Sequence, residues 1–152
     1  MVGSMMMAVS CHCHTHSTQA AYATKCEYLN NELDGSITVR AYGQGRNRGD
    51  ALAQARKNAI HQVIFEGIYV PGNEALSRPL IFGNNITTKH EEFFNNFFRD
   101  GGEYKNFVHN TDRRIRTNEK SWTGTQAKIS TTITVERGLL KQYLKDQNII
   151  NE

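Results

Sequence analysis

The chain has 152 residues, with 18 Lys and Arg against 15 Asp and Glu, so its formal net charge is only +3. A chain of this length forms one domain and buries enough surface to fold without metals or disulfides. The 38% hydrophobic and 22% charged residues exclude collagen, a coiled coil and disorder of the whole chain. No apolar run approaches the ~18 residues that a membrane-spanning helix needs, so we expect no such helix in this chain.

Residues 1–35 differ in composition from the rest and predict a flexible N-terminal segment. A short apolar run ends in Ala8-Val9-Ser10-Cys11, which resembles the lipobox of bacterial lipoproteins, where the cysteine receives a lipid. The run is shorter than the ~7–15 apolar residues of a typical signal, and no Lys or Arg precedes it. We expect Cys11 to be lipidated; the alternative is an unstructured tail.

The same segment is rich in side chains that bind zinc or Cu(I). These are Cys11, His12, Cys13, His14 and His16. Their spacing is not that of a structural zinc site, whose paired cysteines are usually two to four residues apart. A metal-handling protein for zinc or copper is therefore the alternative function. The cysteines leave the compartment open, because an anchor plus a Cys13–Cys26 bridge and three reduced thiols both fit the sequence.

Two regular elements are predicted between residues 36 and 66. Ile37, Val39 and Ala41 alternate with polar side chains, which predicts a strand over 36–43. Asp50 is a good N-cap for the helical apolar pattern that follows, so we predict a helix over 50–66. Alanines on the buried side of this helix would let it lie close to a sheet.

The second half of the chain is less regular until its end. Residues 80–82 fit either a strand or a packed loop, and a helix is predicted over 89–99. Its Phe93, Phe94, Phe97 and Phe98 form one stripe, which we interpret as core. An extended strand is predicted over 103–116, a β-branched strand over 127–135 and a short amphipathic helix over 137–147.

This order of elements predicts an α+β fold. Strands separated once by helices and then consecutive favour a small, mainly antiparallel sheet of about three to four strands, with helices packed on one face. We place this single domain at residues 36–150.

No catalytic constellation stands out in the sequence. The spacing Gly43-x-Gly45-x-x-x-Gly49 is one residue longer than a dinucleotide fingerprint and has no acidic residue at the expected distance, so we interpret it as a flexible turn. His61, His90 and His109 lie on different predicted elements, and their spacing indicates no triad. We therefore expect no enzymatic activity.

Two surfaces are candidates for partner contacts. One is Tyr42 with the glycine-rich turn after it, and the other is the basic edge formed by Arg113, Arg114 and Arg116. The arginines also allow a nucleic-acid-binding module as a further alternative. The pI of 8.8 is below the value of about 9 that is usual for duplex binders.

Both well-patterned ends of the domain resemble the small bacterial envelope lipoproteins related to the N-terminal domain of flagellar assembly protein T. The likeness covers residues 36–66, a glycine-bearing strand followed by an alanine-rich helix, and residues 126–148, a closing strand and short helix. These motifs are structural and carry no active-site residues. The resemblance implies a periplasmic or outer-membrane-associated protein that acts without enzymatic activity.

The sequence thus predicts a cell-envelope lipoprotein that serves as an accessory or assembly component through protein–protein contacts. Its expected partner is another envelope protein, its expected attachment is the lipid on Cys11, and homo-oligomerisation is a further hypothesis.

Overall fold

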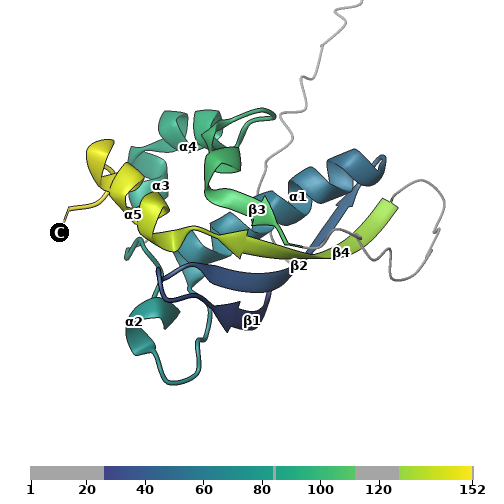
Figure 1. Cartoon of the computed structure of the whole chain (residues 1–152). Coiled ribbons are helices and arrows are strands. Elements are labelled where there is room, and N and C mark those ends of the chain that lie inside the picture. Colours follow the sequence, from purple (N-terminus) through teal and green to yellow (C-terminus); the bar gives the residue numbers. More distant parts are fainter. Residues whose placement is uncertain (1–25, 84, 112–126, 152) are drawn as a thin grey trace, which may run out of the picture.

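A four-stranded antiparallel sheet organises the molecule, as the computed structural model in Figure 1 shows for residues 26–83, 85–111 and 127–151. The strands are β1 (Glu27–Asn31), β2 (Ile37–Gly45), β3 (Val108–Asn110) and β4 (Ala127–Val135). Their order is β1-β2-β4-β3, so the two long strands lie side by side at the centre. Ile37 pairs with Val135, and Gly45 pairs with Ala127 at the other end.

The helical elements of the described residues lie between β2 and β3 and after β4. They are α1 (Arg48–His61), the π-helix η2 (Gln62–Glu66), α2 (Glu74–Ser77), α3 (Ile86–Lys89), α4 (Glu91–Phe98), the 3-10 helix η3 (Glu103–Phe107) and α5 (Arg137–Asp146). In Figure 1, α1 runs behind the sheet, and none of the helices that the structure describes lies in front of β2 and β4. The predicted α+β class with a mainly antiparallel sheet is confirmed.

Glycine sets the distance between β2 and α1. A Cβ added to Gly43 would lie 2.0 Å from the carbonyl oxygen of Ala51 and 2.6 Å from the amide nitrogen of Ala55. At Gly45, a Cβ would lie 2.6 Å from the amide nitrogen of Ala51. Since Ala51 and Ala55 are fully buried, small residues on both elements let the helix backbone touch the strand. The prediction that Gly43 and Gly45 belong to a flexible turn is therefore wrong: both lie in β2, where they allow close packing against α1.

Aromatic rings fill the space beneath α4. Phe94 and Phe97 are buried, and Phe93 and Phe98 are partly buried against the same core, which confirms that the phenylalanine stripe is core. Phe97 is 1% exposed and stacks on Tyr143 of α5, with ring centroids 5.9 Å apart. This contact joins the middle of the chain to its last helix.

At its C-terminal end, α1 continues as the π-helix η2, and a later loop supplies hydrogen-bond donors to two carbonyl oxygens of η2. The amides of Leu80 and Ile81 donate to the carbonyl oxygens of Val63 and Ile64 at 3.2 Å and 2.9 Å. Residues 80–82, which fit either a strand or a packed loop by sequence, thus form a loop in which Leu80 and Ile81 are buried and Phe82 is exposed. The Gln62 side chain accepts a hydrogen bond of 2.6 Å from the amide of Cys26.

Three sequence predictions need correction. First, β1 begins at Glu27, inside the segment 1–35 that was predicted to be flexible, so the ordered sheet starts before residue 36. Secondly, residues 103–107 form η3 instead of extended strand, because Tyr104 and Phe107 are both buried three residues apart, the period of a 3-10 helix. Thirdly, the helix predicted over 89–99 is confirmed as α4 but is shorter, Glu91–Phe98, and a separate short helix, α3, precedes it and ends at Lys89.

Candidate functional site

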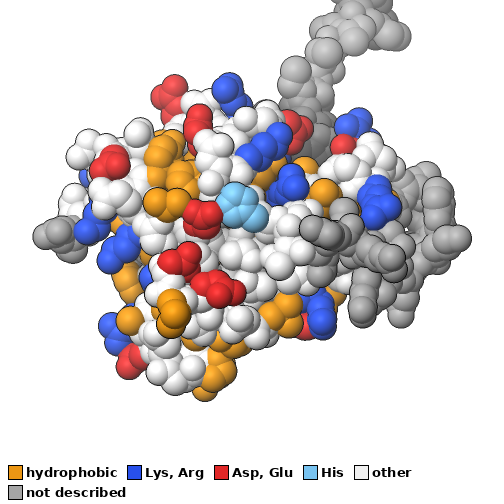
Figure 2. Space-filling view, in the orientation of Figure 1, with side chains coloured by type: hydrophobic (Ala, Val, Ile, Leu, Met, Phe, Trp, Pro, Cys, Tyr) orange, Lys and Arg blue, Asp and Glu red, His pale blue; other side chains and the backbone are white. Residues whose placement is uncertain are grey.

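The face of the sheet turned away from α1 is polar, and no helix among the described residues covers it; we call it the open sheet face. Alternation along the strands places every second side chain on it. Its residues are Glu27, Thr38, Arg40, Tyr42, Gln44, Lys128, Ser130, Thr132, Thr134 and His109. Figure 2 views the molecule from this side and shows mostly uncharged polar surface at its middle, with few hydrophobic atoms there.

A carboxylate on β1 holds the predicted contact residue Tyr42. The Tyr42 hydroxyl donates to Oε1 of Glu27 at 2.6 Å, and Arg40 donates to Oε2 of the same carboxylate at 3.2 Å. The hydrogen bond to Glu27 raises the pKa of the Tyr42 phenol. Glu27 and Arg40 are exposed and Tyr42 is partly buried, and exposed ion pairs contribute about 0–1 kcal/mol to stability. The main consequence of this cluster is a fixed orientation of Arg40 and Tyr42.

Hydroxyl and histidine side chains form further side-chain contacts across β2, β3 and β4. The Thr134 hydroxyl lies 2.8 Å from the hydroxyl of Thr38 on β2 and 2.8 Å from that of Thr111, next to β3. Nε2 of His109 contacts the carboxylate of Glu136 at the end of β4. Neighbouring strands therefore present side chains that are already bound to one another, which lowers the entropy lost when a partner fixes them.

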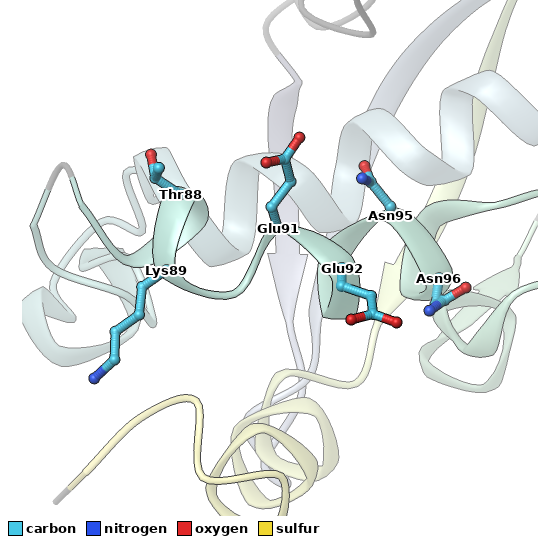
Figure 3. Close-up of a pocket in the computed structure, with 6 residues that line it drawn as sticks. All are labelled: Thr88, Lys89, Glu91, Glu92, Asn95 and Asn96. Atoms are coloured by element: carbon cyan, nitrogen blue, oxygen red, sulfur yellow. The ribbon is translucent and has the colours of Figure 1, made fainter.

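A second polar surface lies along α3 and α4. Its hollow is lined by Thr88, Lys89, Glu91, Glu92, Asn95 and Asn96. Figure 3 shows that these side chains fan out from the two helices and do not converge on one point. Glu91 and Glu92 occupy the first turn of α4, where negative charge is favoured by the helix dipole. We interpret this surface as the solvated side of the aromatic helix.

The three histidines of the folded part do not form a site. His61 packs against Phe65, with ring centroids 4.8 Å apart, and burial lowers its pKa to about 4. His90 lies between α3 and α4, and His109 is on β3. In the part of the chain that the structure describes, no three His, Cys, Asp or Glu side chains are grouped so that they could hold a metal ion.

Several predicted site residues lie outside the described part of the chain. These are Cys11, His12, Cys13, His14, His16, Arg113, Arg114 and Arg116. Their roles in lipidation, metal binding and partner contacts stay predictions. Cys26, the remaining cysteine, is buried, and burial raises the pKa of its thiol to about 12.

Sequence reasoning missed most of the open sheet face. Alternation already indicated that Arg40 and Tyr42 point the same way. Their partner Glu27 requires the register of β1 against β2, which a bulge between Tyr28 and Asn30 alters. The contact of His109 with Glu136 likewise requires β3 to lie beside β4.

Comparison with known proteins adds no relative. A scan against models of protein families, a search of curated proteins and a search of solved structures each found no match. Among the helices of the described residues, none has the length and apolar character needed to cross a bilayer.

Proposed function

We propose that this chain is a non-enzymatic component of the bacterial cell envelope that acts through protein–protein contacts made by its open sheet face. The observation that carries the proposal is the cluster of Glu27, Arg40 and Tyr42, in which one carboxylate orients two side chains on a sheet face that no described helix covers. Tyr and Arg are enriched among the residues that dominate binding energy in protein interfaces. A flat, pre-ordered polar surface suits a protein partner better than a small molecule, which binds in concave pockets.

The envelope address rests on the sequence. Ala8-Val9-Ser10-Cys11 resembles a lipobox, and residues 36–66 and 126–148 resemble envelope lipoproteins. A lipid on Cys11 would hold the domain near a membrane through the residues that precede β1. Even a weak contact would then suffice, since tethering raises the effective concentration of partners in the same membrane.

Site-specific photo-crosslinking in the native host tests the contact surface. A photoreactive residue at Gln44 or Ser130 samples the open sheet face, and the same residue at Asn95 on α4 is the matched control. We expect one discrete crosslinked product from the first two positions, lost when Tyr42→Ala and Arg40→Ala are introduced, and none from Asn95. Equal crosslinking at Asn95, or none at the open sheet face, would contradict the proposed surface.

Intact mass of the membrane-associated protein tests the address separately. We expect a chain cut before Cys11 and carrying added lipid, and Cys11→Ser should release the protein from membranes. An unmodified chain that retains Met1 would overturn the lipoprotein part and leave the contact surface to be judged by crosslinking.

A further inference from the structure

Basic side chains from three separate segments meet in a hollow beside the start of α1. The hollow has a volume of about 570 Å³ and lies between the end of β2, the part of α1 from Asp50 to Lys57 and the turn that joins α4 to η3. Arg46 comes from the turn after β2, Lys57 from α1 and Lys105 from η3. Two acids also line it, Asp50 and Asp100.

The charges in the hollow are unevenly matched. Nε of Arg46 lies 3.0 Å from Oδ2 of Asp50, and Nζ of Lys57 lies 2.8 Å from Oδ1 of Asp100. Lys105 adds a third positive charge. The positive charges of Lys57, Lys105 and Arg46 all lower the pKa of the Asp100 carboxyl, with Lys57 having the largest effect. Asp100 is thus surrounded by more positive charge than it neutralises.

The two partners of the Lys57–Asp100 pair differ in how firmly the fold holds them. The Lys57 side chain is 16% exposed, and its Nζ lies 5.6 Å from the ring centroid of the fully buried Tyr104. The Asp100 side chain is 95% exposed and follows the end of α4, next to Gly101 and Gly102. The lysine is therefore part of the packed structure, whereas the carboxylate reaches it from solvent.

We propose that this hollow binds a small phosphate-bearing anion, which replaces the Asp100 carboxylate on Lys57 and contacts Lys105. A phosphate offers more negative charge and more acceptor oxygens than one carboxylate, so it pairs with two ammonium groups at once. Gly45 also lines the hollow, and its close packing against α1 fixes that wall. The hollow adjoins the open sheet face and shares Gln44 with it.

Titration of the full chain with inorganic phosphate at constant ionic strength tests the site, followed by the amide NMR signals of Asp100, Gly101 and Lys105. We expect saturable shifts confined to the lining of the hollow. Lys57→Gln and Lys105→Gln should each weaken binding about tenfold, since a charge-assisted hydrogen bond is lost. Lys105 is exposed, so its variant keeps the fold even if Lys57→Gln does not.

Removal of the competing carboxylate gives the sharper test. Asp100→Asn should tighten phosphate binding by more than Glu103→Gln, which removes the same charge from η3 at a residue that does not line the hollow. Equal effects of the two variants would mean that only the overall charge matters, and would overturn the site. Shifts that do not saturate, or that survive Lys105→Gln unchanged, would overturn it as well.

Discussion

Replacing Gly43 by alanine should destabilise the protein strongly, although alanine normally stabilises regular structure. The new Cβ would lie 2.0 Å from the carbonyl oxygen of Ala51, and ordinary contact begins at 3.4 Å. The helix backbone must therefore move away from β2, which loosens the packing of Ala55 and the core residues that follow it on α1. Overpacking of this kind costs about 1–3 kcal/mol, and the loss of glycine's chain entropy offsets only about 0.5–1 kcal/mol of it.

Urea unfolding measures this effect directly. With an m-value of about 1–3 kcal/mol/M, we expect the midpoint of Gly43→Ala to fall by about 1 M. Gly138→Ala in α5 is the matched control. Its Cβ would have only the carbonyl oxygen of Asp34 within 4 Å, at 3.7 Å, which is an ordinary contact distance. This control should gain up to about 1 kcal/mol from helix propensity. An unchanged midpoint for Gly43→Ala would refute the conclusion that glycine sets the helix-to-strand distance.

Three further predictions concern the core. Thr131→Val should raise the free energy of unfolding by about 1 kcal/mol in urea, because the buried Thr131 hydroxyl has no hydrogen-bond partner among the described residues. A decrease of the same size would mean that this hydroxyl is hydrogen-bonded in the folded protein. Phe97→Ala should cost about 3–5 kcal/mol in thermal unfolding, whereas Asn95→Ala on the exposed side of the same helix should stay within about 0.5 kcal/mol. Burial lowers the pKa of His61 from 6.5 to about 4, so the contribution of His61 to stability should be constant above pH 7. It should fall by about 3 kcal/mol from pH 6.5 to 4, because the unfolded chain takes up the proton first. In His61→Gln the fall between pH 6.5 and 5 should disappear, and its persistence there would assign the effect to another group.

The elements predicted well from the sequence are those whose pattern is local. Ile129, Thr131 and Ile133 alternate with polar residues along β4, and the apolar side chains of α1 and α5 recur at helical spacing. In each case one face is buried and the other exposed, so periodicity alone identifies the element.

The elements that were missed depend on distant contacts or on an unusual period. Glu27–Asn31 has mixed polarity and an irregular register, so its strand character comes from pairing with β2. Tyr104 and Phe107 do carry a local signal, since a spacing of three fits a 3-10 helix, but the same residues also fit a strand with gaps. The hollow around Lys57 brings together residues far apart in the chain, which no local pattern reveals.

The reactivity of the buried Cys26 thiol reports how often the edge of the sheet at β1 opens. Only the thiolate reacts readily with alkylating reagents, and a pKa of about 12 keeps this sulfur protonated at neutral pH. Its neighbouring amide is held by Gln62 of η2, so a reagent reaches the sulfur after β1 has separated from the end of the long helix. The alkylation rate at Cys26, compared with that in urea, would therefore give the free energy of this local opening without any added label.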